Sequence, residues 1–428
     1  MKENFIKSTI ILMVGGILAK VLGMFIKIFM ARTIGVQGLG IYMLVLPTFT
    51  LVISISQFGL PLALAKLISE NTKSTKKLFF SILPIAIIIN IIMMFLIILL
   101  SPIISSNFLK NSNLKIIIQS MALIIPFTTI SSICRSYYFG KSRMIPNVIS
   151  TIIEALIRLF FIIIIIPLII PYGIYYTIHI LILSNIISES LSTIVLILFL
   201  PAKIKIKRKD ILPDKKYIKE SLQIAIPNTT SRLISSIGYF LEPIILTNVL
   251  LQTGYTRKYI IKEYGIISGY IIPLLLLPSF FTLAISEALL PVISKEQEMG
   301  NIRNIKKKIK QAVLFSFFIA LPVTFLLMIK PDFFLKTIYH TKEGIPYLEV
   351  LAPICLLQYF QAPISSSLEA MGKSKDIMKI TVVTTTIRTI LTYFLGKLKI
   401  GLWSLISAIS INIILTTYLE VKQLKKYL

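Results

Sequence analysis

The sequence predicts an all-α membrane protein that crosses the bilayer about twelve times. Of its 428 residues, 56% are hydrophobic and only 15% are charged, whereas soluble domains are nearer a quarter charged. The mean hydropathy is +0.86. Apolar runs of about 20 residues, the length a helix needs to cross about 30 Å of hydrocarbon, recur along the whole chain. These runs are continuous rather than alternating, which argues against a transmembrane barrel.

The predicted spans and the distribution of positive charge give a topology. We expect transmembrane helices at residues 8–30, 39–64, 78–101, 115–136, 146–170, 173–200, 221–250, 265–293, 311–330, 346–368, 378–396 and 400–420. The chain starts MKENFIK without a small-residue cleavage site, so the first span is predicted to be retained rather than removed as a signal peptide. The N-terminus, the connections after even-numbered spans and the C-terminal tail hold 29 Lys and Arg residues, against 11 on the opposite side. The positive-inside rule therefore predicts a multi-pass plasma-membrane protein with both termini in the cytoplasm.

Two six-helix lobes are predicted at 1–200 and 221–428, joined by the basic cytoplasmic linker PAKIKIKRKDILPDKKYIKE at 201–220. This linker is expected to set topology and to meet anionic headgroups. Internal similarity supports two halves, because GKSRMIPNVIS at 140–150 resembles GKSKDIMKIT at 372–381. Each half has an even number of spans, so the halves are parallel repeats. Such repeats favour a central substrate cavity between the lobes and alternating access by rocking.

Charge and cysteine content argue against several other classes. The net charge is +27, but the lysines fall between the apolar runs, which is a topology signal, and no nucleic-acid partner is expected. Cys134 and Cys355 lie in or beside apolar segments, and His179 and His340 have no ligand-like neighbours. Neither a disulfide framework nor a zinc site follows from them. No catalytic residue, metal site or cofactor is predicted, and the coupling ion is open between Na⁺, H⁺ and the membrane potential.

The first span carries two cations in its interior, Lys20 and, seven residues on, Lys27. A cation near the bilayer centre costs at least about 2.5–3.5 kcal/mol, so it normally faces protein or water. Seven residues make two helical turns with only about 20° of rotation, so both lysines project from one face. This face is predicted to line a hydrated cavity, with Arg232 of the seventh span at a similar depth. The alternative is that each lysine pairs with a carboxylate for packing alone.

Four further charges within spans are secondary cavity candidates. Glu154 and Arg158 lie four residues apart in the fifth span, close enough to neutralise each other within one helix, which favours a structural pair. Glu189 lies near mid-depth in the sixth span and is a candidate partner for a cavity lysine. Arg388 is central in the eleventh span.

Residues 15–70 resemble the N-terminal segment of the stage V sporulation protein B family. The most specific parts are Lys20-Val-Leu-Gly23, Arg32-Thr-Ile-Gly35, Gly38-Leu-Gly40-Ile-Tyr42, and Gly59-Leu-Pro61 with Ala65-Lys66-Leu67. That family belongs to the polysaccharide-exporter branch of the multidrug/oligosaccharidyl-lipid/polysaccharide flippase superfamily. The resemblance implies a MATE-like fold of two six-helix lobes around a central cavity. It also implies movement of lipid-linked peptidoglycan or polysaccharide precursors across a bacterial plasma membrane, in spore cortex or cell-wall synthesis.

The resemblance also implies roles for particular residues. Relatives that flip the peptidoglycan precursor lipid II keep cations on the first span and in the central cavity, and Lys20, Lys27 and Arg232 occupy matching places as contacts for the pyrophosphate. This chain departs from the pattern in two ways. Longer relatives carry two further C-terminal spans, and some relatives have arginines where this chain has lysines, which are less suited to bidentate phosphate recognition.

The leading hypothesis is a flippase for an anionic lipid-linked saccharide, whose partners are that substrate and membrane lipids. The alternative is a cation-coupled multidrug antiporter of the same fold. Such an antiporter needs cavity carboxylates to bind Na⁺ or H⁺, and no Asp lies within any predicted span. A membrane enzyme would need acids or metal ligands on sizeable outer loops, and the outer connections are short, so no enzyme activity is expected. A structural role in envelope assembly is a further alternative.

Overall fold

A computed structural model describes residues 2–70, 74–141, 143–200 and 214–428. These residues form helices joined by short turns, with no β-strand among them, which confirms the predicted all-α class. Contacts divide the chain into two units, Met1–Phe240 (unit 1) and Leu241–Leu428 (unit 2). Most of the predicted linker, residues 201–213, lies outside the described residues.

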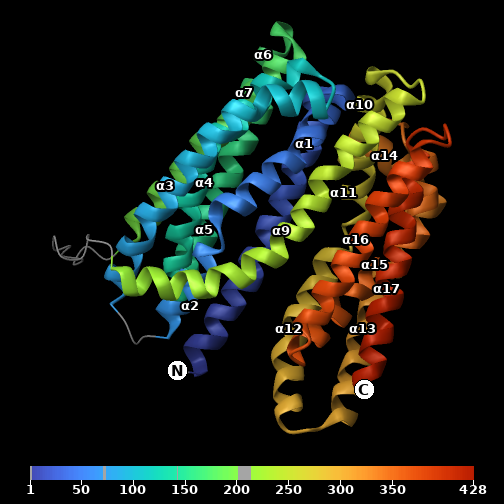
Figure 1. Cartoon of the computed structure of the whole chain (residues 1–428). Coiled ribbons are helices and arrows are strands. Elements are labelled where there is room, and N and C mark those ends of the chain that lie inside the picture. Colours follow the sequence, from blue (N-terminus) through green and yellow to red (C-terminus); the bar gives the residue numbers. More distant parts are fainter. Residues whose placement is uncertain (1, 71–73, 142, 201–213) are drawn as a thin grey trace. The chain divides into compact units, whose positions relative to one another are not determined.

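Unit 1 contains the helices that Figure 1 colours from blue to green, together with the start of α9. The elements are α1 (Lys2–Gln57), α2 (Leu60–Ser69), α3 (Thr75–Pro102), η1 (Ile103–Phe108), η2 (Ser112–Leu114), α4 (Lys115–Gly140), α5 (Met144–Phe160), η3 (Phe161–Ile165), α6 (Ile166–Ile169), η4 (Ile170–Tyr172), α7 (Ile174–Leu198) and the first part of α9 (Lys215–Gln252). Its main packing partners are α3 with α4, α4 with α7, and α1 with α5. These helices therefore form one bundle.

Unit 2 contains the rest of α9 and the helices that follow it, coloured yellow to red in Figure 1. They are α10 (Arg257–Gly265), η5 (Ile266–Ile271), α11 (Ile272–Leu275), α12 (Ser279–Glu298), α13 (Ile302–Ile329), α14 (Pro331–Tyr339), α15 (Ile345–Ala370), α16 (Ser374–Gly396) and α17 (Trp403–Tyr427). Helix α15 is central, because it packs against α12, α13 and α17.

The helices correspond to the predicted spans. Eight helices of the described residues are long and apolar enough to cross a bilayer, and the run from α10 to α12, bent by 53°, counts as a ninth. Helix α1 holds two predicted spans. Helices α15 and α16 coincide with the predicted tenth and eleventh spans, although glutamine, serine and threonine make them less apolar. The chain is therefore a multi-pass membrane protein with about twelve crossing segments.

Gly35 divides α1 into two arms. Its backbone (φ 66°, ψ 179°) is not helical, and it is a conformation that glycine adopts without the strain a Cβ would add. After this residue the chain turns back on itself (Figure 1). The two arms account for the predicted first and second spans.

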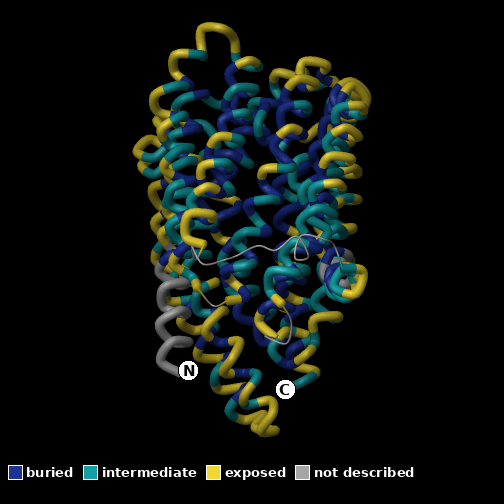
Figure 2. The backbone as a smooth tube through the Cα atoms, turned by 90° about the vertical axis from the view of Figure 1, so that its left-hand side faces the viewer, coloured by how far each residue is buried: buried dark blue, intermediate teal, exposed yellow. Residues whose placement is uncertain are grey.

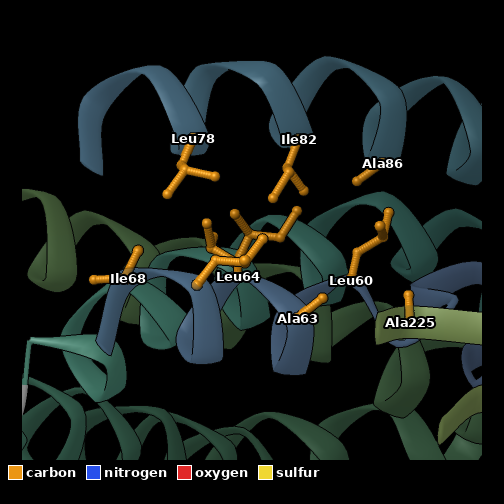
Figure 3. Close-up of a cluster of buried hydrophobic side chains, with 10 residues drawn as sticks. Leu60, Ala63, Leu64, Ile68, Leu78, Ile82, Ala86 and Ala225 are labelled. Atoms are coloured by element: carbon orange, nitrogen blue, oxygen red, sulfur yellow. The ribbon is translucent and has the colours of Figure 1, made fainter. Parts of the chain in front are cut away.

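Helix α2 packs against α4 and α3, and Gly59 at its start approaches Ala225 of α9 closely. Leu60 and Leu64 of α2, Leu78 of α3 and Ala225 of α9 are at most 2% exposed. Figure 3 shows the α2 and α3 side chains pointing toward one another, with Ala225 at one end of the cluster. Gly59 has φ 63°, and a Cβ there would lie 2.8 Å from the Ala225 carbonyl oxygen, so glycine is needed for this close approach. This packing holds the start of α9 within unit 1.

Apolar side chains cover much of the outer surface of the helices. Figure 2 shows exposed residues along the helices as well as at the turns. On α3, Ile88, Ile92 and Leu99 are 56%, 60% and 74% exposed. A soluble protein rarely exposes an apolar stripe of this extent, so these residues form a lipid-facing surface.

Candidate functional site

Lys20 and Lys27 lie on the first arm of α1, with Lys20 partly buried and Lys27 exposed. Leu18 and Phe25, which are 45% and 43% exposed, are also seven residues apart, and each precedes a lysine by two positions. They therefore form a second stripe about 160° around the helix from the lysines. The lysine stripe (Lys20 and Lys27) thus faces a different direction from the exposed apolar stripe (Leu18 and Phe25).

Arg232 is exposed on α9, one turn before Ser236. The hydroxyls of Ser236 and Ser54 share a hydrogen bond of 2.9 Å, near the end of the second arm of α1. Helix α9 runs from Lys215 to Gln252, so Arg232 lies near the middle of this helix. All three predicted cations lie in unit 1, on α1 and α9.

These three cations differ from the arginines buried among the helices. None of the ion pairs among the described residues includes Lys20, Lys27 or Arg232. By contrast, each of three partly buried arginines contacts a glutamate: Arg135, Arg158 and Arg388. A neighbouring glutamate therefore neutralises Arg135, Arg158 and Arg388. Among the described residues, no carboxylate forms an ion pair with any of the three predicted cations.

A network of four charges lies inside unit 1, where α4, α5 and α7 meet. Arg135 of α4 donates to Glu154 of α5 and, at 2.8 Å, to the Ser192 hydroxyl of α7. Arg158 contacts the other carboxylate oxygen of Glu154 at 2.7 Å and Glu189 of α7 at 3.3 Å. The side chains of Glu154 and Glu189 are only 11% and 10% exposed. We call these four residues the unit 1 network.

The unit 1 network is electrically balanced, with two arginines and two glutamates. The structure shows the predicted contact between Glu154 and Arg158, and adds Arg135 as a second partner of the same carboxylate. Glu189 pairs with Arg158, so it is not held by a lysine of α1 as the sequence suggests. Removing one member of such a network strands a buried charge, whereas the intact set needs no external ion.

Unit 2 contains a smaller charged pair. Arg388 of α16 contacts Glu242 of α9, whose carboxylate also accepts a hydrogen bond from the Tyr264 hydroxyl at 3.5 Å. Arg388 lines a cavity of about 140 Å³ together with Gln358, Gln361 and Asn412. The Nε atom of Arg388 has no hydrogen-bond partner among the described residues. The pair therefore borders a polar space instead of being enclosed by other charges.

Sequence reasoning missed Arg135 and the pairing of Glu242 with Arg388. Arg135 falls at the end of the predicted fourth span, where it reads as a residue of the following connection, but α4 continues to Gly140. The apolar pattern that continues beyond Arg135 is the signal that could have placed this residue inside the helix. Glu242 and Arg388 are far apart in sequence, and no local pattern links them.

The described residues do not bring together three His, Cys, Asp or Glu side chains as ligands for a metal. Cys134 is partly buried, Cys355 is buried, and both are free thiols. The two cysteines belong to different units.

The helices, their two units and the balanced charges inside them define a multi-pass α-helical membrane protein. Two family models match its sequence, "polysaccharide biosynthesis protein" over residues 5–297 and "MatE" over residues 268–394. The first match covers more than half of the chain. The chain therefore belongs to the polysaccharide biosynthesis protein family.

Two relatives in Bacillus subtilis (strain 168) are similar to this chain along almost its whole length. Stage V sporulation protein B is 29% identical over 438 residues, covering 100% of this chain and 85% of that protein. Sporulation protein YkvU is 23% identical over 431 residues, covering 98% of this chain and 94% of that protein. The resemblance seen in residues 15–70 thus extends through the chain.

Solved structures share the fold. An inward-facing multidrug resistance MATE family transporter of the MOP superfamily has a TM-score of 0.77 at 15% identity, covering 95% of this chain and 94% of its own. The lipid II flippase MurJ in an inward closed conformation has a TM-score of 0.75 at 17% identity, covering 96% and 87%. The predicted MATE-like fold is confirmed.

Proposed function

We propose that this chain is a flippase that moves an anionic lipid-linked saccharide, a precursor of peptidoglycan or another polysaccharide, across the bacterial plasma membrane. Lys20, Lys27 and Arg232 contact the pyrophosphate of the substrate. The two lobes alternate between inward and outward access, with both chain termini in the cytoplasm. The proposed activity is transport of an intact lipid and involves no bond cleavage.

The observation that carries this proposal is that Arg135, Arg158 and Arg388 pair with glutamates, whereas no ion pair among the described residues includes Lys20, Lys27 or Arg232. The unit 1 network neutralises itself, so it offers no free positive charge to a ligand. The lysine stripe has no carboxylate partner among the described residues and faces away from the exposed apolar stripe of its own helix. A fixed pair of ammonium groups inside a span needs an anion or water. A pyrophosphate headgroup supplies that anion.

The family match and the two sporulation-protein relatives support the same substrate class. A polyprenyl-pyrophosphate sugar carries permanent negative charge and a polar saccharide, so it crosses hydrocarbon only along a polar route. Lysine provides a point charge on a flexible stem. Such contacts bind the headgroup without fixing its orientation, which suits a step in which the headgroup must also leave.

The test is transport of a polyprenyl-pyrophosphate saccharide with a labelled sugar in vesicles containing the purified protein. A quencher added outside reports how fast the label reaches the outer leaflet. Each lost contact to a charged group removes about 1.5–3 kcal/mol, so the double variant Lys20→Ala/Lys27→Ala should lose at least about tenfold in transport at low substrate. The variant Lys20→Arg/Lys27→Arg keeps the charge and should keep most of the transport.

The matched control is Leu18→Ala/Phe25→Ala, which changes the opposite stripe of the same helix at nearly the same depth. It should leave transport within a few-fold of the parent chain. Full transport by Lys20→Ala/Lys27→Ala, or an equal loss in the control variant, would reject the role of the lysine stripe.

A cation-coupled multidrug antiporter is the second candidate, because a MATE transporter shares the fold and the MatE model matches residues 268–394. Such an antiporter attracts cationic drugs with free carboxylates. Three of the four buried glutamates described, Glu154, Glu189 and Glu242, are already held by arginines. Resistance of expressing cells to cationic dyes would favour this candidate over the flippase.

A further inference from the structure

Helix α17 carries a polar stripe through an otherwise apolar span. Asn412, Thr416 and Glu420 follow one another at intervals of four residues, so they lie on one face of the helix. Each has a buried side-chain oxygen without a hydrogen-bond partner among the described residues, namely Asn412 Oδ1, Thr416 Oγ1 and Glu420 Oε2. Glu420 is 4% exposed within the apolar segment Trp403–Tyr427. We call these three residues the α17 stripe.

Helix α15 supplies donors to the same face. Ser365 donates to Glu420 Oε1 at 2.7 Å. One turn earlier, Gln361 donates to the Thr417 hydroxyl at 2.8 Å and to the Ile413 carbonyl oxygen at 3.1 Å. The contact between α15 and α17 is therefore polar over at least two turns, although both helices lie in an apolar environment.

The α17 stripe leads to the polar cavity of unit 2. Gln361 and Asn412 both line this cavity of about 140 Å³, and Arg388 borders it from α16. A space of this size with several polar groups accommodates water molecules. Thr416 lies one turn from Asn412 and one turn from Glu420, so its hydroxyl lies between the cavity and the carboxyl group along the helix.

Glu420 differs from the other buried glutamates of the described residues. Glu154, Glu189 and Glu242 each contact an arginine. No ion pair among the described residues includes Glu420, which accepts a hydrogen bond from the neutral Ser365 hydroxyl. An ionised carboxylate buried without a cation is strongly unfavourable, and in practice the group takes up a proton instead. The same glutamate with a proton is neutral and needs only hydrogen bonds.

The charged groups on the helices around Glu420 do not compensate it. On α15, Glu369 is exposed. On α16, Lys379 is exposed and Asp376 accepts a hydrogen bond from Tyr427 at 2.7 Å. On α17 itself, Lys422 is exposed. Leu424 of α17 belongs to an apolar cluster that also contains Leu289 of α12 and Ile305 and Ile309 of α13.

We propose that Glu420 is a reversible proton-binding site, which exchanges its proton with water along the α17 stripe that leads to the unit 2 cavity. On release, the O–H bond of the carboxyl group breaks, the proton passes to a water molecule, and Glu420 becomes a carboxylate. Uptake is the reverse. The ligand of this site is the proton, and the site exists whatever substrate the chain carries.

Infrared difference spectroscopy of the purified full chain tests this without any transport measurement. A protonated carboxyl group has a carbonyl stretching band that a carboxylate lacks. We expect a band at neutral pH that disappears when the pH is raised, is absent in Glu420→Gln, and remains in the control Glu369→Gln, which changes an exposed glutamate one turn from Ser365. Exchange into D₂O should shift the band, and Thr416→Val should slow that exchange.

A second variant keeps the test valid if Glu420→Gln fails to fold. Ser365→Ala removes the donor to Glu420 Oε1 and leaves the carboxyl group in place, so the band should shift in frequency rather than vanish. Absence of any band that differs between the parent chain and Glu420→Gln would overturn the proposal. So would loss of the band on adding Na⁺ at constant pH, because Glu420 would then be a metal-cation site.

Discussion

Unit 1 and unit 2 bury charge in different ways. In unit 1, two arginines and two glutamates from α4, α5 and α7 pair with one another, and Ser192 and Ser188 add further hydrogen bonds. In unit 2, one arginine holds Glu242 beside a polar cavity, while Glu420 has a serine as its partner. The charges of unit 1 are therefore balanced within one network, whereas those of unit 2 lie beside a polar cavity or depend on a neutral partner.

This difference indicates that the buried charges of the two units have different roles. A balanced set of buried charges fixes the relative positions of three helices, because moving any one of them strands a charge. A carboxyl group that depends on a proton, next to a cavity, changes its charge without such rearrangement. We therefore expect the internal charges of unit 1 to act as scaffold and those of unit 2 to respond to their surroundings.

The largest effect should come from opening the unit 1 network. Glu154→Ala removes the carboxylate that both Arg135 and Arg158 contact. Loss of one partner from a buried ion pair costs about 3–5 kcal/mol. We expect a decrease of this size in the free energy of unfolding, measured by denaturant titration in detergent.

The control for this prediction is Glu349→Ala, which removes an exposed glutamate from α15. It should change the free energy of unfolding by less than about 0.5 kcal/mol. A similar small change in Glu154→Ala would show that the unit 1 network does not hold its helices together.

A smaller effect is expected for the pair in unit 2. In Arg388→Ala, Glu242 keeps the hydrogen bond from Tyr264, and the adjoining cavity admits water to the stranded carboxylate. We expect a loss of about 1.5–3 kcal/mol in the free energy of unfolding, the range for a hydrogen bond to a charged group. The double variant Glu242→Gln/Arg388→Ala should recover most of this loss, because no charge is left unpaired. A loss equal to that of Glu154→Ala, with no recovery, would remove the contrast between the two units.

The sequence predicts the membrane-crossing pattern well, because burial in lipid leaves a strong and local signal. The apolar runs, the connection between the first two spans at residues 31–38 and the spacing of Glu154 and Arg158 all concern residues close together in the chain. The lysine stripe is equally local, since a separation of seven residues alone places Lys20 and Lys27 on one face.

The remaining features depend on contacts between distant segments. Arg135 joins Glu154 only because α4 and α5 pack side by side with Arg135 still inside the bundle. The neutral partner of Glu420 is evident only from the packing of α15, because Ser365 is distant from Glu420 in the sequence. The start of α9 belongs to unit 1 through packing of Ala225 on α2, which the charge pattern of the linker does not reveal. These three features are determined by contacts between distant segments, which the periodicity of the sequence does not show.

The smallest expected effect concerns two partly exposed aspartates, Asp214 and Asp376, each of which connects the start of a helix to a neighbouring helix. In unit 1, Asp214 precedes α9, contacts Lys77 of α3 at 2.8 Å and accepts from the Lys216 amide at 2.9 Å. In unit 2, Asp376 at the start of α16 accepts from the neutral Tyr427 hydroxyl at 2.7 Å. Only the first tie is an ion pair, so it should be the more sensitive to salt.

The pKa of Asp214 also predicts its response to acid. The hydrogen bond from Lys77 and then the one from the Lys216 amide hold the pKa of this carboxyl below its usual value. A carboxyl whose pKa is lower in the folded state stabilises that state above its unfolded pKa, about 3.9, and loses this contribution as the pH falls through the folded pKa. Docking of the α9 start should therefore be constant near neutral pH and weaken only in strong acid.

Hydrogen exchange of the amides at residues 215–220 and 374–380 measures both ties in one sample. Raising the salt to 1 M, where the Debye length is about 3 Å, should speed exchange at the start of α9 and leave the start of α16 unchanged. Asp214→Asn should make the α9 amides exchange faster at low salt and remove their response to salt, while Asp376→Asn should do neither. If salt accelerates both segments equally, the ion pair is not what holds α9 to α3. The docking would then rest on the apolar contacts of Leu60, Leu78 and Ala225 and on the hydrogen bond from the Asp214 amide to the Ser81 hydroxyl.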